Sequence, residues 1–254
     1  MEVFTVEEMI EAYQLDFPKM VIGKGSNSLF SDRGFEGLVI LNRIDFCQWE
    51  EEGVLVGSGY SFSRLGSQSA RKGFKGLEFA SGIPATVGGA IFMNAGANGS
   101  ETCRVLKSVD VLDGYEKKTF LKEEIEFGYR TSSFQTMNLV ILSAFFHLER
   151  DASSRKRQLE ILFHRMKTQP LQEKSAGCIF QNPPGYSAGA LIEQCGLKGI
   201  RVGGAKVSEK HANFIVNESG ASAKEVKELI ELVQERVFEQ TGVFLTTEVR
   251  IFDE

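Results

Sequence analysis

The 254-residue sequence has few cysteines, and no two of them lie close together. The four cysteines (Cys47, Cys103, Cys178 and Cys195) are far apart in the sequence and form no CxxC pattern. The first eight residues lack the basic and then apolar order of a secretory signal peptide. We therefore expect reduced thiols in the cytoplasm, and not a disulfide framework.

Long hydrophobic runs and an excess of positive charge are also missing. The longest mainly apolar run, Leu139–Phe146, has the length of a strand, whereas a membrane span needs about 18 residues or more. Lys and Arg number 29 against 34 Asp and Glu, and the resulting net charge of −5 argues against sequence-independent binding to nucleic acid. With 42% hydrophobic and 25% charged residues, the composition is that of a soluble globular protein. We expect neither a membrane nor a nucleic-acid partner.

Glycine is what the sequence has in excess. It supplies 26 of the 254 residues, and 15 of the 26 lie between Gly23 and Gly99. The glycines follow no G-X-Y period, which excludes a collagen-like chain. Because glycine lets the backbone turn with positive φ or approach another group closely, this cluster predicts a ligand lying against main chain.

Hydrophobic periodicity predicts a mixed chain, strand-rich before about residue 150 and helix-rich after it. Asp113-Gly114 predicts a hairpin, and Gly73, Pro170 and Gly242 predict helix ends. A first helix is predicted to begin at the capping box Thr5–Glu8, and a last one to run from the capping box Ser222–Glu225 to Gly242. The helices predicted between them cover Ser63–Lys72, Leu159–Met166 and Ser187–Cys195. The predicted strands include Val21–Ile22, Leu38–Leu41, Val54–Gly57, Leu139–Leu148 and Val243–Phe252.

The first glycine-rich loop, Gly23–Ser28, follows a short predicted strand. Its successive backbone N–H groups, with donors from Ser26 and Asn27, are suited to cradle a pyrophosphate. Lys24 is not followed by Ser or Thr, as it is in a Walker loop, and Ser28 stands where a Rossmann fingerprint has its third glycine. On these residues alone, an ordinary tight turn is an equally good interpretation.

Five further stretches carry candidate site residues. Gly82–Ala90 and Met93–Gly99 are long and built of small residues, which favours a ligand on main chain over a merely well-packed loop. The other three are Phe127–Phe134, where Arg130 needs an anionic partner, Ser175–Pro184, which holds Cys178, and Gly203–Phe214, which holds His211. The residues alone leave open a buried structural role for Cys178 and a structural hydrogen bond for His211.

In this order, the motifs resemble the UDP-N-acetylenolpyruvoylglucosamine reductase family, flavoenzymes of bacterial peptidoglycan synthesis. The resemblance implies an α+β protein with an FAD-binding fold of the vanillyl-alcohol-oxidase type in two subdomains, over residues 1–150. A smaller α+β substrate-binding domain would follow over residues 151–254. Only 47 residues separate Arg130 from Cys178, which resembles the shorter type without an extra substrate-capping loop. The family normally carries another stretch before the first helix, so we expect a short N-terminal edge here.

The resemblance implies FAD and NADPH as cofactors and UDP-N-acetylglucosamine enolpyruvate as the small-molecule substrate. Arg130, Cys178 and Glu248 match the catalytic positions, with Cys178 where the family usually has serine. Hydride would pass from flavin N5 to the enolpyruvyl β-carbon, and Cys178 would protonate the α-carbon to give UDP-N-acetylmuramate. A thiol is a much stronger acid than a serine hydroxyl, so cysteine suits this role near neutral pH.

The resemblance also implies binding residues, and it implies no metal. The candidate cofactor contacts are Gly23, Lys24, Gly25, Ser26, Asn27, Ser28, Gly82, Ile83, Pro84, Thr86, Gly88, Gly89, Asn94 and Gly96. The candidate substrate contacts are Lys167, Gln181, Asn182, Lys206, His211 and Asn213.

Two alternatives stay open on the sequence. One is a related FAD oxidoreductase with another substrate, and the other is a non-catalytic homologue that binds flavin or a UDP-sugar. The Cys178 and Glu248 motifs, placed in the C-terminal domain, argue against the first alternative. The joint presence of Arg130, Cys178 and Glu248 favours an enzyme over the second. We expect a cytoplasmic monomer that serves peptidoglycan precursor synthesis, and through it cell wall biogenesis, cell shape and cell division.

Overall fold

The computed structural model describes residues 1–253, which form two compact units. Unit 1 comprises Met1–Lys24 and Gly37–His164, and unit 2 comprises Gly25–Glu36 and the chain from Arg165 onward. The division between units falls inside a helix at residues 164 and 165, and the first glycine-rich loop is divided between the two units after Lys24. The domain boundary near residue 150, which rests on the change from strand-rich to helix-rich sequence, remains a prediction.

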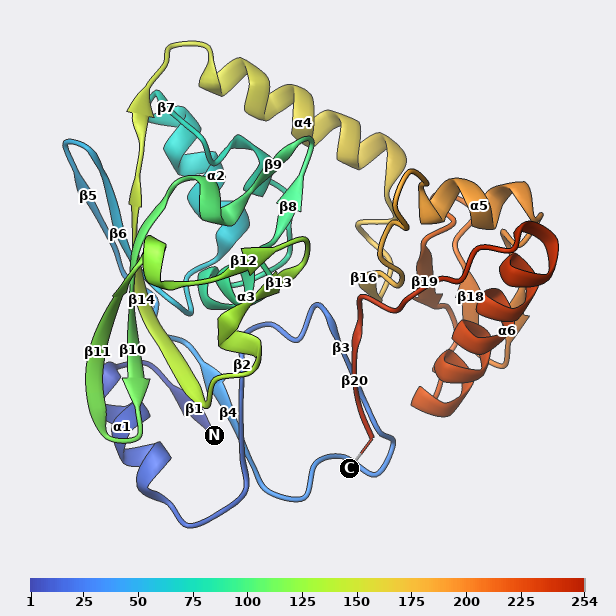
Figure 1. Ribbon diagram of the computed structural model, residues 1–254, viewed down its shortest axis with the longest axis horizontal. Helices are drawn as coiled ribbons and strands as arrows, with labels where there is room; N and C mark the ends of the chain where they lie inside the picture. The colour runs from blue at the N-terminus through green and yellow to red at the C-terminus, as the bar shows by residue number, and fades with distance from the viewer. Residues whose placement is uncertain (254) are drawn as a thin grey trace. The chain divides into compact units, whose positions relative to one another are not determined.

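A five-stranded antiparallel sheet, in the order β11-β10-β14-β6-β5, is the centre of unit 1 (Figure 1). Alternate residues of β14 face two cores: Ile141 packs with α2 and α3, whereas Val140 and Leu142 pack with α1. This is the period of two expected of a strand buried on both faces. The elements are β5 (Cys47–Glu50), β6 (Gly53–Gly57), α2 (Phe62–Arg71), α3 (Val87–Phe92), β10 (Leu106–Asp113), β11 (Glu116–Leu121) and β14 (Leu139–His147).

A small parallel sheet, in the order β1-β4-β2, completes unit 1 together with α1. Thr5 caps α1, because its Oγ1 accepts from Glu8 N at 3.1 Å, and Glu8 Oε2 accepts from Phe4 N at 2.6 Å. These elements are β1 (Glu2–Val3), α1 (Val6–Gln14), β2 (Lys19–Ile22) and β4 (Leu38–Asn42). Short pairs are β7 (Phe74–Lys75) with β15 (Glu149–Arg150), β8 (Gly96–Ala97) with β9 (Ser100–Glu101), and β12 (Phe127–Gly128) with β13 (Thr131–Ser132). Short 3₁₀ helices cover Glu78–Ala80, Thr102–Arg104, Lys122–Glu124 and Ser133–Gln135.

Unit 2 is built on a four-stranded antiparallel sheet in the order β16-β19-β18-β17. Two helices, α5 and α6, pack on it through a core that includes Ile192, Leu229, Val233 and Ile215. The elements are β3 (Ser28–Phe30), α4 (Ser154–Thr168, shared with unit 1), β16 (Ser175–Cys178), α5 (Ala188–Gln194), β17 (Arg201–Val202), β18 (Ala205–Val207), β19 (Phe214–Asn217), α6 (Ala223–Thr241) and β20 (Arg250–Phe252).

The structure confirms most predicted helices, and α6 most fully. Ser222 Oγ accepts from Glu225 N at 3.1 Å, Glu225 Oε2 accepts from Ser222 N at 2.9 Å, and Gly242 ends the helix with a φ of 70°. The helix predicted over Leu159–Met166 lies within α4, but its apolar stripe is not buried as a whole, since Phe163 and Met166 are exposed.

The predicted strand over Val243–Phe252 is too long. The observed strand, β20, covers Arg250–Phe252 and pairs in parallel with β3, and Thr247 forms an isolated bridge to Phe180. Leu245 and Val249 are buried as the alternation suggested. A segment forms a strand only where it is hydrogen-bonded to a neighbouring strand. Apolar alternation in the sequence does not reveal where that pairing begins.

Removal of the α6 cap provides a test of this architecture. Ser222→Ala leaves the Glu225 N–H without its side-chain acceptor, so we expect a loss of about 1 kcal/mol in the free energy of unfolding. Urea denaturation of this variant and of Ser219→Ala, an exposed serine on the same loop, measures the difference. Equal midpoints for the two variants would contradict a stabilising cap.

Candidate active site

In unit 1, the first glycine-rich loop packs directly against the second. A Cβ at Gly23 would lie 2.2 Å from Thr86 Oγ1, far inside van der Waals contact. Lys24 Nζ donates to Ser61 Oγ at 3.1 Å, and Ser61 forms an isolated antiparallel bridge with Thr86. Position 23 therefore requires glycine because any side chain there displaces Thr86.

The second glycine-rich loop is fixed by hydrogen bonds at the start of α3. Thr86 Oγ1 accepts from Gly89 N at 3.2 Å and so caps the helix. Gly88 N donates to Ser58 O at 2.8 Å, which ties the loop to the chain that follows β6. The turn ahead of this cap contains Gly82, Ile83 and Pro84, with Gly82 at a φ of 85°.

These loops offer features that fit FAD. A Cβ at Gly88 would lie 3.0 Å from the Ser58 Cβ, so this glycine allows two backbone segments to approach closely. Beside them, the Ser81 hydroxyl is buried and has no hydrogen-bond partner among the described residues. That hydroxyl is enclosed by protein atoms, whereas the glycines of these loops carry no Cβ and would let their main chain approach the pyrophosphate of a bound dinucleotide.

Asn94 holds two hairpins together beside these loops. Its Nδ2 donates to Glu101 Oε2 at 3.1 Å and to Gly128 O at 2.9 Å, and its Oδ1 accepts from Cys103 N at 3.1 Å. The residue is buried and has a φ of 40°. Its side-chain amide is thus engaged within the protein, where it ties the two hairpins together.

Arg130 occupies the tight turn between β12 and β13 with a φ of 59°. A left-handed backbone is costly for a residue other than glycine and tends to occur at functional sites. Gln135 Nε2 donates to Arg130 O at 3.0 Å, which helps to hold this conformation. The guanidinium carbon lies 5.0 Å from the centroid of the Tyr129 ring, and a Cβ at Gly96 would lie 3.2 Å from Arg130 Nη1. Gly96 thus leaves room for the guanidinium.

In unit 2, Cys178 ends β16 just after an irregularity in the sheet. The register between β16 and β19 shifts between Ser175 and Cys178, and Gly177 has a φ of 80°. Bulges of this type redirect the side chains that follow them. The Cys178 thiol is half-buried.

Unit 2 brings Glu248 and part of the first glycine-rich loop next to Cys178. Glu248 N donates to Ile179 O at 2.7 Å, and Asn27 Nδ2 donates to Glu248 O at 3.2 Å. A Cβ at Gly177 would lie 3.8 Å from Ser26 O. Three segments singled out in the sequence, at Ser26–Asn27, Cys178 and Glu248, therefore meet within one unit.

Among the predicted substrate contacts, Asn213 has an internal role. It is buried, its Oδ1 accepts from Phe180 N at 2.9 Å, and its Nδ2 donates to Phe180 O at 2.8 Å. The next two residues are Gln181 and Asn182, and Asn182 Oδ1 accepts from Ala188 N at 3.0 Å at the start of α5. Asn213 therefore positions the segment that carries two other candidates.

The remaining substrate candidates differ in their surroundings. Burial lowers the pKa of His211, whose Nδ1 accepts from Asn213 N at 3.2 Å, so its imidazole is neutral near pH 7 and bears its proton on Nε2. Lys206 lies on β18 with its ammonium 3.3 Å from Glu218 Oε1. Lys167 is exposed on the last turn of α4.

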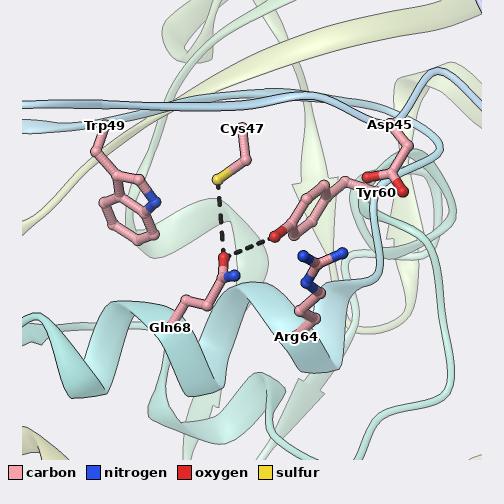
Figure 2. A pocket seen from close by; sticks show the side chains of 6 residues that line it. All are labelled: Asp45, Cys47, Trp49, Tyr60, Arg64 and Gln68. Atoms are coloured by element: carbon pink, nitrogen blue, oxygen red, sulfur yellow. Dashed lines mark hydrogen bonds between the residues drawn. The ribbon is translucent and has the colours of Figure 1, made fainter.

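The structure also shows features that sequence patterns did not single out. Ser58 and Ser61 support the glycine-rich loops from a segment that is distant in the sequence, through contacts that no local pattern encodes. A cavity of about 320 Å³ between β5 and α2 is lined by Asp45, Cys47, Trp49, Tyr60, Arg64 and Gln68, and Figure 2 shows the Cys47 and Tyr60 side chains directed at Gln68. None of the predicted site residues lines this cavity.

Residues 1–253 contain no helix long and apolar enough to cross a membrane. Over the same residues, His, Cys, Asp and Glu side chains do not gather in threes as a metal-binding cluster would.

Comparison with known proteins agrees with this geometry. Residues 5–117 match the model of an FAD binding domain, and residues 169–252 match that of the UDP-N-acetylenolpyruvoylglucosamine reductase C-terminal domain. The chain is 54% identical to UDP-N-acetylenolpyruvoylglucosamine reductase from Protochlamydia amoebophila, over 98% of this chain and 85% of that protein. It is 50% identical to the reductase of the same name from Chlamydia abortus, over 93% and 80% of the two chains.

A solved structure gives the same result. The crystal structure of UDP-N-acetylenolpyruvylglucosamine reductase (MurB) from Thermus caldophilus matches with a TM-score of 0.87 and 39% identity, over 99% of this chain and 91% of that one. An FAD-binding domain joined to this C-terminal domain defines an FAD-dependent oxidoreductase that uses NADPH. The chain belongs to the UDP-N-acetylenolpyruvoylglucosamine reductase family. The predicted fold class, family and cofactors are confirmed, and neither alternative function is favoured.

Proposed function

We propose that the protein reduces UDP-N-acetylglucosamine enolpyruvate to UDP-N-acetylmuramate with NADPH, as a cytoplasmic monomer without membrane or nucleic-acid partners. When bound, FAD supplies the hydride that is added to the enolpyruvyl β-carbon. Residues 1–150 are proposed to hold the cofactor and residues 151–254 the substrate. Segment 25–36, which packs in unit 2, is the exception to this division.

The proposed catalytic residues act on the charge and the proton of the substrate. Addition of hydride to the β-carbon leaves negative charge on the α-carbon and its carboxylate. The guanidinium of Arg130 stabilises that charge, and the Glu248 carboxyl would add to this if it carries a proton. Cys178 then donates its S–H proton to the α-carbon and becomes a thiolate.

The binding roles follow from the surroundings of each residue. Gly23–Ser28 and the loop from Gly82 to Gly89 present main chain to the cofactor, with Gly96 beside Arg130. Gln181 and Asn182, on the segment that Asn213 fixes, together with Lys167, Lys206 and His211, are proposed to contact the sugar and the diphosphate. Lysine suits the diphosphate, and the neutral His211 offers an N–H donor.

One observation carries this proposal: the backbone bond of 2.7 Å between Glu248 N and Ile179 O. It sets the proposed electrostatic group beside the residue that follows the proposed proton donor, although 70 positions separate Cys178 and Glu248 in the sequence. Contact between groups so distant in the chain is expected where both act on one substrate.

The test is NADPH oxidation by the FAD-bound protein with and without UDP-N-acetylglucosamine enolpyruvate. We expect sustained oxidation only when the enolpyruvyl substrate is present, with one NADPH consumed for each molecule of product. UDP-N-acetylglucosamine, which lacks the enolpyruvyl double bond, serves as the control. A flavin-loaded protein whose NADPH oxidation ignores the enolpyruvyl substrate would refute the proposal.

A further inference from the structure

Glu248 lies where the C-terminal segment passes from one pairing partner to another. Thr247, just before it, forms an isolated antiparallel bridge with Phe180. Arg250, two residues after it, begins β20 and pairs in parallel with Ser28 on β3. Glu248 is a member of neither pair and lies outside the strands. The conformation of its backbone therefore depends on individual hydrogen bonds at the crossover.

The backbone of Glu248 is held at both its N–H and its carbonyl group. Its N–H donates to Ile179 O at 2.7 Å, on the segment that carries Cys178. Its carbonyl oxygen accepts from Asn27 Nδ2 at 3.2 Å, on the first glycine-rich loop. Asn27 makes a second contact with the same segment, because its own carbonyl oxygen accepts from Arg250 N at 3.0 Å. Asn27 thus fixes the chain on the C-terminal side of Glu248.

The contact between Asn27 and Glu248 depends on the amide group of the asparagine. A carbonyl oxygen can only accept a hydrogen bond, so the atom of Asn27 that faces Glu248 O is the donor Nδ2. An ionised aspartate of the same size offers acceptors alone and would place an oxygen against that carbonyl. The contact therefore requires a side-chain donor at position 27, and a polar side chain of the right size is not enough.

The segment Gly25–Glu36, which carries Asn27, is anchored in unit 2 by other contacts as well. Its strand β3 pairs with β20 over three residues on each side. Asp32 Oδ1 accepts from Ala223 N at 2.8 Å at the start of α6. Loss of the Asn27 side chain therefore removes a local contact without detaching the segment, so its effect can be measured in a folded protein.

We propose that Asn27 is a positioning residue for Glu248, whose carboxyl it directs by fixing the backbone to which that side chain is attached. The first glycine-rich loop then has two roles: its main chain serves the cofactor, and the Asn27 side chain serves the reaction of the substrate. This role differs from the cofactor contact expected of Asn27 on the sequence. The inference rests on the proposed function, because it gives Glu248 a part in that reaction.

Asn27→Asp and Asn27→Ala both remove the donor, and the first also keeps the size of the side chain. In both holoenzymes the FAD content and the rate of flavin reduction by NADPH should stay near those of the wild type. Reoxidation of the reduced enzyme by UDP-N-acetylglucosamine enolpyruvate, followed in anaerobic single turnovers, should slow roughly 10–100-fold, because misplacing a reacting group by about 1 Å can cost that much.

A double-mutant cycle with Glu248→Ala separates positioning of Glu248 from a general loosening of the site. The Glu248→Ala chain keeps the backbone carbonyl that Asn27 binds, but it has no carboxyl group left to direct. Adding Asn27→Ala to this variant should therefore slow reoxidation by less than about twofold more. A purely structural role would show its full effect in both backgrounds.

Hydrogen exchange gives a readout that needs no catalysis. In the FAD-bound protein without substrate, the Asn27 variants should speed amide exchange in the peptide that covers residues 245–252. Asn217→Ala is the matched control, because Asn217 Nδ2 also donates to a backbone oxygen of unit 2, Ala221 O, at 3.4 Å. That variant should change neither the exchange of this peptide nor the rate of reoxidation.

Slow reoxidation with normal flavin reduction, lost in the Glu248→Ala background, supports the inference. Wild-type reoxidation in both Asn27 variants overturns it. Loss of FAD, slow reduction by NADPH or failure of both variants to fold also overturns it, because the side chain would then serve the cofactor or the fold. Failure of the proposed function has a different signature: the enolpyruvyl substrate would not reoxidise the reduced wild-type enzyme at all.

Discussion

Cys178→Ala should reduce turnover of UDP-N-acetylglucosamine enolpyruvate by about 10²–10⁴-fold, the usual contribution of a general acid. Alanine carries no proton to give to the α-carbon, so negative charge that forms there has no donor beside it. Reduction of the bound FAD by NADPH should continue, because that half-reaction uses no proton from Cys178. Stopped-flow absorbance of the flavin and steady-state product formation separate the two halves.

Cys178→Ser is the matched control for this variant. Serine keeps a side chain of similar size with a transferable proton, so much of the activity should remain. Ordinary turnover by Cys178→Ala would show that another group protonates the substrate. Loss of flavin reduction in Cys178→Ala would show that the substitution disturbs the cofactor site.

Gly23→Ala should yield protein with little bound FAD. The new Cβ would lie 2.2 Å from Thr86 Oγ1 and 2.8 Å from Thr86 Cγ2, so the two glycine-rich loops must separate. Overpacking of this kind costs about 1–3 kcal/mol, and here it also disturbs the residue that caps α3. The ratio of flavin absorbance at 450 nm to protein absorbance at 280 nm measures the loss of bound FAD. The wild type should carry roughly one flavin for each chain.

Thr86→Ala provides the control for that clash. By itself it removes the α3 cap, which costs about 1 kcal/mol, and it should lower FAD content less than Gly23→Ala does. The double variant lacks the clashing Oγ1 and Cγ2 atoms and should retain more FAD than Gly23→Ala alone. Equal or lower FAD content in the double variant would mean that contact with Thr86 is not why position 23 is glycine.

Elements with signals inside the element itself were predictable from sequence. α6 carries its capping box, its apolar face and its terminal glycine within 21 residues, Ser222–Gly242, and all three act as expected. The hairpin at Asp113-Gly114 joins β10 and β11 for the same reason. The end of the chain was mispredicted because its pairing with β3 and Phe180 depends on residues far away in the sequence.

The same contrast holds for the site residues. The glycine-rich loops were found because close backbone approach leaves a compositional signal. Asn94 and Asn213 are polar residues of the kind that contact ligands, yet their side-chain amides form hydrogen bonds with backbone groups of the protein itself.

The sequence by itself determined the family, the cofactor class and the presence of two glycine-rich loops, because each of these is recorded in residue types at fixed local spacings. The tertiary structure decided which of those residues meet. Gly23 packs on Thr86, Glu248 binds the residue after Cys178, and the first loop divides its residues between two units after Lys24. These contacts join segments tens to hundreds of residues apart, and strand pairing and packing set them without leaving any local periodicity in the sequence.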